Sequence, residues 1–428
     1  MSEVQFKDSG VDWIGAVPID WEVTRLKSVS ANAETGKRPP DESEEVLSIG
    51  GEHIQEGMFY LENPRYVSFE TFKGSKGKIH IGDLLIVKDG ATIGKCMYVN
   101  TMPEERMLLN EHVYRMGIEK FFYYWIETTG AQFWFRSNNM STAQESIPQN
   151  TLYSLPVVVP RKATREKISC YLDEKTAAID GKVAVLEKKL AAYKRLKKSI
   201  INRAVTRGLD PNVKLKDSGV DWIGQVPERW KIFRLKDLIS SVDSGGTPKA
   251  TNEKFYSDSS DGVPWVTIAD MSSFDYVIET QKHLTDAGVQ DKNLDVYPIG
   301  TVLYSMYATI GKVSELAIPA TINQAMLAIQ NNWRSHKSYF KYSLRAFELW
   351  VSAYTTESTQ KNLNADRVRR FLMPTPPLAE QQAIADYLDT ECAKIDRAAE
   401  IVTREIDAYK RLKRSLINEV VTGKRKVA

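Results

Sequence analysis

Two long segments of this 428-residue chain place apolar residues at steps of three and four, which keeps one stripe on one face of an α-helix. The first stripe contains Ile168, Leu172, Ile179, Val183, Leu186, Leu190, Tyr193, Leu196, Ile200 and Ala204. The second contains Ile384, Leu388, Ile395, Ala399, Val402, Ile406, Tyr409, Leu412, Leu416 and Val420. Pro377 suits a first helical turn, and Gly208 and Gly423 suit helix ends, so each helix is predicted to span roughly 44 residues.

A narrow stripe cannot bury itself, so the two helices are predicted to pair with each other. A globular stretch between them returns the chain and favours an antiparallel pair, with the basic KRLKKS run of the first helix near Asp386, Asp389 and Glu391. Basic residues near a helix C-terminus also complement the helix dipole, so a docking role for this run stays open. The seam is predicted to contain Ile179, Leu186, Leu190, Tyr193, Leu196, Ile395, Val402, Ile406, Tyr409 and Leu412.

The chain repeats itself. Residues 7–27 return as residues 216–236 with 15 of 21 positions identical, and residues 192–206 return as 408–422. The stretches between barely match, yet both contain ATIGK, and Asn110 answers Asn323. Short apolar strands are predicted at 83–88, 263–268 and 301–305. The predicted fold is α+β: two mixed α/β domains (1–160 and 209–375) separated by an antiparallel coiled coil of long helices (161–208 and 376–428), with internal pseudo-twofold symmetry.

Composition limits the class of protein. Apolar residues make up 42% of the chain, which is long enough for two cores. Three cysteines without paired spacing give neither a disulfide framework nor a zinc site, and the sequence shows no secretory signal or membrane-spanning run, so a cytoplasmic protein is predicted. The net charge is only +3; residues 161–208 hold 14 Lys and Arg against 5 Asp and Glu, whereas residues 1–160 hold 15 against 22. Any DNA contact by the variable stretches must therefore use local basic loops.

Two loops rich in Gly and Lys are candidates for following a phosphate backbone, although ordinary solvated hairpins would look the same. They lie at 72–80 and 245–256, and the Lys of each ATIGK and nearby aromatics could add contacts. Asn110 and Asn323 could bond adenine edges or hold structural turns. The DNA-binding candidates are Lys73, Lys76, Lys78, Lys95, Lys249, Lys254, Tyr256, Tyr304 and Lys312.

Motifs for catalysis are missing from the sequence. GATIGK lacks the spacing of a Walker loop, no GxGxxG follows a strand, and the five histidines show no ligand spacing. Carboxylates such as Asp173, Glu174 and Asp389 are interpreted as solvated helix faces. We therefore expect no catalytic residue, cofactor or metal in this chain.

The doubled SGVDWIG..P..W...RLK, the GGTPK...FY...VPWVTIAD...LT..GV run, both ATIGK motifs, PPLAEQQAIADYLD and the doubled AYKRLKxS together resemble the specificity subunit of type I restriction-modification systems. The resemblance covers nearly the whole chain. It implies two target-recognition domains that each read half of a split double-stranded DNA site, spaced by the helical pair. It also implies two modification (methyltransferase) subunits that bind S-adenosylmethionine and methylate adenine, and restriction subunits that use ATP and Mg to translocate and cleave DNA.

One departure from the pattern stands out. The first helix begins with PRKATREKISCYLD where the second has PPLAEQQAIADYLD, which puts equal docking at the two ends in doubt. Two other functions stay open from the residues alone. A self-sufficient DNA-modifying enzyme would act without partners, and a coiled-coil scaffold that does not bind DNA would fit the modest net charge.

Overall fold

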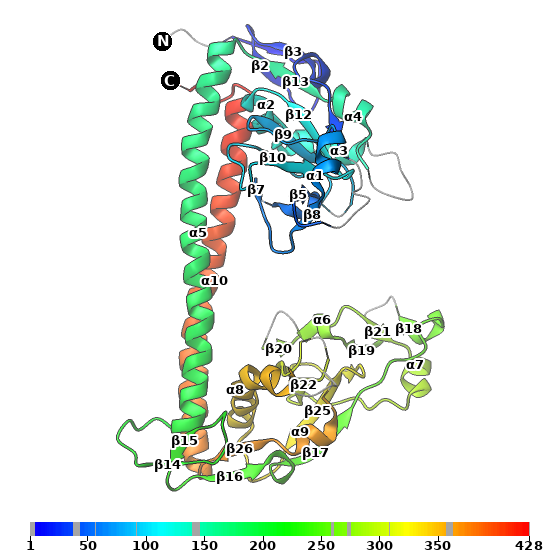
Figure 1. Cartoon of the computed structure of the whole chain (residues 1–428). Coiled ribbons are helices and arrows are strands. Elements are labelled where there is room, and N and C mark those ends of the chain that lie inside the picture. The colour runs from blue at the N-terminus through cyan, green and yellow to red at the C-terminus, as the bar shows by residue number, and fades with distance from the viewer. Residues whose placement is uncertain are drawn as a thin grey trace. The chain divides into compact units, whose positions relative to one another are not determined.

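The structure of the protein is a computed structural model that describes residues 5–36, 43–55, 57–90, 92–138, 146–257, 261–271, 275–307, 309–356 and 363–427 (Figure 1). The chain forms two compact units. Unit 1 combines residues 1–187 with 403–428, and unit 2 comprises residues 188–402. Each unit therefore contains one mixed domain together with half of each long helix, a division that differs from the four sequence segments.

Unit 1 holds thirteen named strands and four short helices besides its parts of the long ones, within the described residues. Its strands are β1 (Phe6–Asp8), β2 (Ala16–Pro18), β3 (Glu22–Arg25), β4 (Glu34–Thr35), β5 (Val46–Ile49), β6 (Ile54–Gln55), β7 (Met58–Phe59), β8 (Arg65–Val67), β9 (Asp83–Val87), β10 (Cys96–Tyr98), β11 (Met107–Leu109), β12 (Val113–Gly117) and β13 (Pro156–Val159). Its helices are α1 (Phe69–Gly74), α2 (Lys120–Ile126), α3 (Thr129–Ser137) and α4 (Gln149–Ser154), with 3-10 turns η1 (Leu26–Ser28) and η2 (Gly51–His53).

Unit 2 repeats this plan with longer helical cover. Its strands are β14 (Leu215–Asp217), β15 (Gln225–Pro227), β16 (Lys231–Arg234), β17 (Ile239–Ser244), β18 (Tyr256–Ser257), β19 (Val263–Val266), β20 (Tyr276–Val277), β21 (His283–Leu284), β22 (Val302–Ser305), β23 (Val313–Leu316), β24 (Thr321–Ile322), β25 (Met326–Asn331) and β26 (Leu372–Thr375). Its helices are α6 (Ile268–Met271), α7 (Asp286–Asp291), α8 (Lys337–Thr356) and α9 (Ala365–Arg369), with η3 (Leu235–Asp237) and η4 (Glu253–Phe255).

The two domains share one topology, although their sequences barely match. The main sheet runs β10-β9-β12-β4 in unit 1, and β23-β22-β25-β17 with the extra strand β20 in unit 2. A second sheet contains one parallel pair in each copy, β11 with β5 and β24 with β19. The opening repeat pairs with the strand before the long helix in the same register, Pro156 opposite Arg25 and Leu372 opposite Arg234. The predicted α+β class and the common domain plan are therefore confirmed.

The predicted long helices are α5 (Lys162–Arg207, 46 residues) and α10 (Leu378–Val421, 44 residues). Gly208 and Gly423 follow them, each with a φ of 75° that favours glycine. Their last turns are buried in the units: Val205 packs in the core of unit 2 with Trp230 and Leu388, all 0% exposed. Burial of these ends, rather than helix propensity, holds the helices in place.

The helices run antiparallel within each unit. In unit 1, Lys413 Nζ lies 2.7 Å from Asp180 Oδ2 and Lys410 Nζ lies 3.4 Å from Glu187 Oε1, so residue numbers fall on α10 as they rise on α5. In unit 2, Lys197 Nζ lies 2.8 Å from Asp396 Oδ2. On α10, the carboxylate that pairs with the KRLKKS run is thus Asp396, rather than the predicted Asp386, Asp389 or Glu391.

The predicted seam holds for most of its members and is wrong for two. Ile179, Ile395, Val402 and Ile406 are buried, and Leu186, Leu190, Tyr193 and Tyr409 are half-buried. Leu196 and Leu412, however, are 46% and 51% exposed. The heptad continues from Tyr193 by a step of four to Lys197 and from Tyr409 to Lys413, so two lysines occupy the positions assigned to these leucines.

These two lysines stand at equivalent places in the repeat, as do their partners Asp180 and Asp396. Lys197 additionally reaches Asp275 at 3.0 Å, and Arg345 contacts the same carboxylate at 2.9 Å. Burial lowers the pKa of Lys197, but hydrogen bonds to the two carboxylates outweigh it and raise the pKa above its usual value. Burial likewise raises the pKa of Asp275, and the charges of Arg345 and Lys197 overcome that effect and lower it. The seam lysine of unit 2 therefore ties both helices to the domain.

Replacement of the two seam lysines by methionine should have unequal effects. Lys197→Met breaks the half-buried contact with Asp275 as well as the exposed one with Asp396 and should lower the local free energy of opening by about 1–3 kcal/mol. Lys413→Met removes only the equivalent exposed pair with Asp180, worth about 0.2–1 kcal/mol. Hydrogen exchange of residues 193–201 and 409–417 measures both. Equal loss at the two sites would contradict the role of Asp275 in unit 2.

Candidate nucleic-acid interface

The predicted loop of unit 1 forms a basic cluster around two aromatic rings on α1. Phe69 and Phe72 stack with ring centroids 6.1 Å apart. Lys73 Nζ lies 4.8 Å from the Phe69 centroid, and Lys78 Nζ lies 5.1 Å from that of Phe72. Arg106, which is not among the candidates predicted from the sequence, places its guanidinium 4.8 Å from the Phe69 ring. These cation–π contacts hold several positive charges on one small surface.

Lys76 is exposed in the same loop, between Lys73 and Lys78. Lys73 also lies 4.0 Å from Glu70, but both side chains are largely exposed, so this pair barely neutralises the charge. Arg106 could not be found by sequence spacing because it lies just before β11, well outside the loop at 72–80. The cluster of Lys73, Lys76, Lys78 and Arg106 is the candidate phosphate-binding surface of unit 1.

In unit 2 the corresponding surface combines the GGTPK loop with a hollow of about 240 Å³. Lys249 and Lys254 are exposed on the loop. Gly245 is required because a Cβ there would lie 2.1 Å from the carbonyl oxygen of Ile322. Asn293 opposite has a φ of 48°, a left-handed conformation that is uncommon outside glycine.

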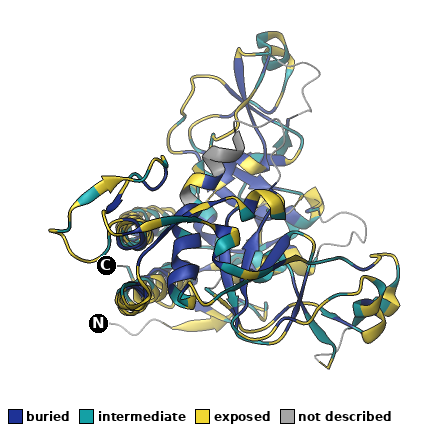
Figure 2. Cartoon of the chain, turned by 90° about the horizontal axis from the view of Figure 1, so that it is seen from below, coloured by how far each residue is buried: buried dark blue, intermediate teal, exposed yellow. Residues whose placement is uncertain are grey.

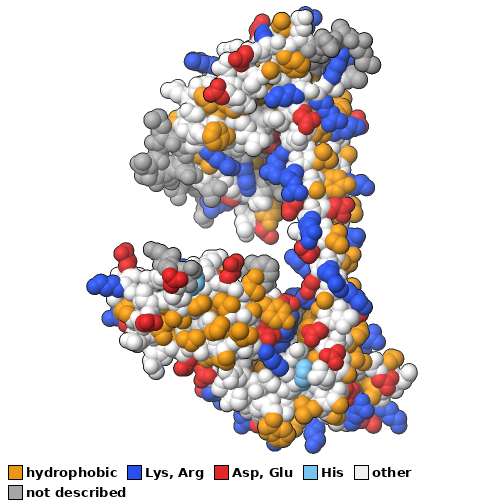
Figure 3. All heavy atoms as spheres, turned by 180° about the vertical axis from the view of Figure 1, so that it is seen from behind, with side chains coloured by type: hydrophobic (Ala, Val, Ile, Leu, Met, Phe, Trp, Pro, Cys, Tyr) orange, Lys and Arg blue, Asp and Glu red, His pale blue; other side chains and the backbone are white. Residues whose placement is uncertain are grey.

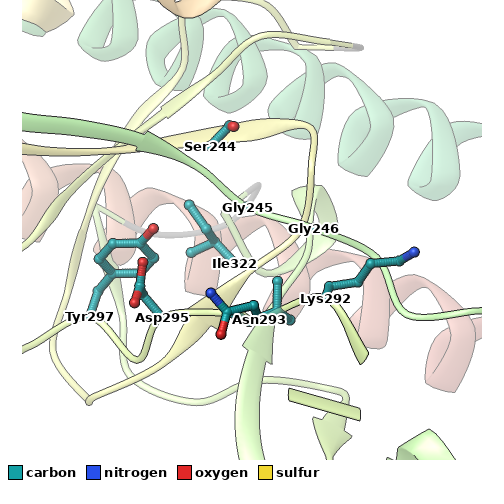
Figure 4. Close-up of a pocket in the computed structure, with 9 residues that line it drawn as sticks. Ser244, Gly245, Gly246, Lys292, Asn293, Asp295, Tyr297 and Ile322 are labelled. Atoms are coloured by element: carbon teal, nitrogen blue, oxygen red, sulfur yellow. The ribbon is translucent and has the colours of Figure 1, made fainter. Parts of the chain in front are cut away.

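Figure 4 shows the hollow, with the Lys292 side chain extending away from it and Asp295 and Tyr297 on the same segment. Its lining residues are Ser244, Gly245, Gly246, Lys292, Asn293, Leu294, Asp295, Tyr297 and Ile322. The hollow thus presents hydroxyl, amide and carboxylate groups close together, with the Lys292 ammonium group outside it. Such a mixture can bond base edges as well as phosphates.

Several sequence candidates have other tasks in the structure. Tyr304 is fully buried, with 0% of its surface accessible to solvent, so it cannot contact DNA at the surface. Tyr256 donates its hydroxyl to the carbonyl of Pro248 at 2.9 Å and packs against Trp265, so it shapes the loop. Lys312 is half-buried, and burial lowers its pKa. Lys95, its counterpart, is exposed and stays a candidate.

The ATIGK motif itself is explained by packing. Gly94 and Gly311 have φ values of 81° and 84°, and a Cβ on Gly311 would lie 2.4 Å from Val351 of α8. On Gly94 it would lie 2.8 Å from Gln132 of α3. The described parts of the motif, residues 92–95 and 309–312, therefore form a tight turn pressed against a helix; Ala91 and Ala308 lie outside the described residues.

The two asparagines hold equivalent turns. Asn110 Oδ1 accepts the backbone NH of His112 at 2.9 Å, and Asn323 Oδ1 accepts that of Ala325 at 3.1 Å. A side-chain oxygen that caps a backbone NH two residues later is a common turn device. The structural interpretation of these asparagines is therefore confirmed.

Each domain is fixed to its long helix by an equivalent hydrogen bond. Tyr124 Oη donates to Asp173 Oδ1 at 2.6 Å, and Tyr342 Oη donates to Asp389 Oδ1 at 2.7 Å. The aspartates occupy the same place in the two YLD sequences. Their interpretation as merely solvated carboxylates was wrong, because each positions the helix of a domain against the frame.

The degraded EQQ motif of α5 keeps its anchoring function. Gln381 is 1% exposed and donates its amide to the carbonyl of Pro376 at 2.9 Å. Arg165, at the equivalent position, donates to the carbonyl of Pro160 at 2.6 Å and pairs with Glu119 at 2.7 Å. A guanidinium therefore replaces the amide in joining the helix to the segment before it.

A second, exposed row of side chains follows each long helix, roughly 100° around the helix from the seam at 3.6 residues per turn. On α5, within unit 2, the α5 row consists of Lys189, Ala192, Leu196, Ser199 and Arg203. On α10, within unit 1, the α10 row consists of the exposed Glu405, Ala408, Leu412 and Ser415 and the half-buried Glu419. Figure 2 looks along the helices and shows exposed positions on their outer surfaces, and Figure 3 shows hydrophobic side chains among Lys and Arg there.

Neither surface resembles a metal site. Within the described residues, His, Cys, Asp and Glu side chains form no group of three that could hold a metal ion. In the same part of the chain, every helix is too short or too polar to cross a membrane.

Comparisons with known proteins agree with this architecture. Residues 227–403 match the family model of the type I restriction modification DNA specificity domain. A solved chain from work on complex assembly and conformational transition of the type I R-M system has the same fold, with a TM-score of 0.67 and 16% identity over 96% of this chain and 99% of that one.

Relatives align along most of this chain. One from Methanocaldococcus jannaschii, assigned as the MjaX specificity subunit of a type I restriction enzyme, is 24% identical over 97% of this chain and 96% of its own length. The MjaVIII specificity subunit of the same organism is 21% identical over 96% and 94%, and the Escherichia coli EcoR124I/EcoR124II specificity subunit is 22% identical over 67% of each. With two copies of one fold on a repeated helical frame, the chain is similar over nearly its whole length to the specificity subunits of type I restriction-modification systems.

Proposed function

We propose that this chain binds a bipartite site in double-stranded DNA, one half through each domain, and directs methylation and restriction by partner subunits. The observation that carries the proposal is a constant frame with two different surfaces. Register, helix anchoring and the Asn turns repeat in both copies, whereas the basic cluster on α1 and the hollow at Gly245 and Gly246 have no sequence in common. A reader of two unlike half-sites requires this combination.

The proposal assigns chemistry to the partners. Modification subunits would bind S-adenosylmethionine and methylate adenine, and restriction subunits would use ATP and Mg. This chain would supply DNA contacts and a mount, without catalytic residues of its own. Because phosphate contacts position a protein and base contacts select the sequence, the basic clusters would set the register of each domain on the duplex, while neighbouring polar groups would choose the bases.

Two modification subunits would dock on the two helical rows. Solvent-exposed residues need not match between copies for folding, yet Ala192, Leu196 and Ser199 are identical to Ala408, Leu412 and Ser415. An exposed leucine at the same place in both helices is explained by contact with the same partner. In this way one chain with two different domains would present two similar docking surfaces for the modification subunits.

Exchange of residues 29–154 for the corresponding stretch of a relative should change one half of the methylated site and leave the other half unchanged. The exchange leaves the pairing of β3 with β13 in place, because both strands lie outside residues 29–154. The incoming domain must carry a tyrosine at the position of Tyr124, so that the hydrogen bond to Asp173 is kept. Methylome sequencing of cells that carry the hybrid and its modification subunits measures the outcome. A hybrid that keeps the original full site would contradict the assignment.

Removal of the basic cluster should weaken DNA binding without changing the sequence read. The triple variant Lys73→Ala, Lys76→Ala and Arg106→Ala should lower affinity about 10- to 100-fold at 0.15 M salt and reduce the salt slope by about 2–3. Titration of duplex DNA in the assembled complex measures both. Lys162→Ala, Lys167→Ala and Lys182→Ala remove three exposed lysines of α5 and serve as the matched control.

Substitution of either exposed leucine should remove one partner. Leu196→Glu or Leu412→Glu should each reduce the stoichiometry of bound modification subunit from two to one, and the double variant should bind none. Native mass spectrometry counts the bound copies, and thermal unfolding should stay unchanged because both side chains are about half exposed. Leu209→Glu, at a leucine 42% exposed beyond the end of α5, should leave two copies bound.

A further inference from the structure

We infer that the α5 row and the α10 row bind the same partner segment with unequal strength, the α5 row more tightly, and that the segment is an amphipathic helix whose apolar stripe is flanked by carboxylates. The inference rests on the docking role proposed above. It follows from which positions of the two rows are kept and which reverse their charge.

The spacing of each row indicates that its occupant is a helix. The row residues follow one another by steps of three and four, the repeat by which one helix packs along another. A helix with two such faces packs in a bundle of more than two helices. Because both rows place alanine, leucine and serine at equivalent positions, both should bind a partner helix with the same complementary apolar stripe.

Charges beside the rows specify the flanks of that helix. Arg195 and Lys198 border the α5 row, and Arg411 and Arg414 stand at the equivalent positions beside the α10 row; all four are exposed. Beside the α5 row, a hollow of about 480 Å³ is lined by Arg195, Lys198, Ser199, Asn202, Arg203, Thr206 and Arg207. Guanidinium groups bind carboxylates in a planar, paired geometry, so an acidic flank fits both rows.

The ends of the rows differ in sign. Lys189 and Arg203 of the α5 row are replaced by Glu405 and Glu419 in the α10 row. Arg425 lies 3.7 Å from the Glu419 carboxylate and offsets part of its charge. A carboxylate-flanked helix is attracted at both ends of the α5 row and repelled at the ends of the α10 row. Two positions that reverse sign, with Glu405 exposed and Glu419 half-buried in the α10 row, should separate the two dissociation constants roughly tenfold at low salt.

Two other occupants are less compatible with these positions. A phosphate backbone would meet Glu405 and Glu419 on the α10 row, which repel it. A second copy of this chain would match the opposite charges of the two rows, but five side chains a row bury far less than the about 1,200 Å² of a stable interface. A partner that binds elsewhere as well has no such limit.

Single-row variants make the two affinities measurable. Leu412→Glu leaves only the α5 row intact, and Leu196→Glu leaves only the α10 row. Calorimetric titration of each with the modification subunit should give a dissociation constant roughly tenfold lower for the Leu412→Glu chain at 50 mM salt. The two constants should converge at 500 mM salt, because exposed charges are then screened.

Charge reversal then tests the cause. Lys189→Glu with Arg203→Glu, added to the Leu412→Glu chain, should raise its dissociation constant about tenfold, and Glu405→Lys with Glu419→Arg should lower that of the Leu196→Glu chain about as much. Lys214→Glu with Lys231→Glu makes the same change of net charge at exposed residues away from both rows and should have no effect.

The outcomes separate the inference from the proposed function. Equal constants at 50 mM salt, or constants that ignore the charge reversals, would overturn the unequal rows and leave docking intact. Two bound copies on both single-row variants would overturn docking on these rows altogether. Self-association of the chain alone at 50 mM salt that disappears with Lys189→Glu and Arg203→Glu would assign the rows to a second copy and overturn the inference.

Discussion

The antiparallel seam between α5 and α10 is the constraint on which the rest of the molecule depends. Each domain is fixed to the frame where one of its helices meets the first part of a long helix, through Tyr124 and Asp173 or Tyr342 and Asp389. Those contacts have a defined place only if the two helices keep their register. The apolar seam alone allows sliding by a heptad, whereas a lysine opposite an aspartate at equivalent places in both units specifies one register.

Specificity of this kind costs little stability. Lys413 and Asp180 are partly exposed, so their pair contributes at most about 1 kcal/mol. In unit 2 the lysine also meets Asp275 and Arg345 of the domain, whereas in unit 1 the equivalent lysine faces Glu127, whose pKa burial raises and Lys413 lowers. One repeated contact is therefore joined to two different domains by two different arrangements of charge.

Much of this architecture could be predicted from the sequence because the chain contains an internal repeat. Period, helix ends and the common domain plan follow from the comparison of one half with the other. The prediction of the seam was wrong at Leu196 and Leu412. A step of three from Tyr193 or Tyr409 reaches a leucine and a step of four reaches a lysine, and the apolar residue was chosen over the lysine. Burial decides between the steps, and a lysine with a carboxylate partner can occupy a seam.

The surfaces were harder to predict than the frame. Lys73, Lys76 and Lys78 were found because they are close in sequence, but Arg106 joins them only through the fold. Tyr304 looked like a surface aromatic, and its strand proved to be central in the sheet, between β25 and β23. The roles of Lys95, Lys249 and Lys254 in DNA binding stay predictions, because exposure permits contact without specifying a base.

The bond from a tyrosine to the YLD aspartate has a consequence for how such proteins diversify. To sit correctly on the frame, a foreign domain needs one phenol at the place that Tyr124 occupies on α2 or Tyr342 on α8, and one strand of matching register. The nearly identical opening repeats supply flanking coding sequence at which genetic crossover can occur. New specificities can thus arise by recombination between whole domains, without any change to the residues that assemble the complex.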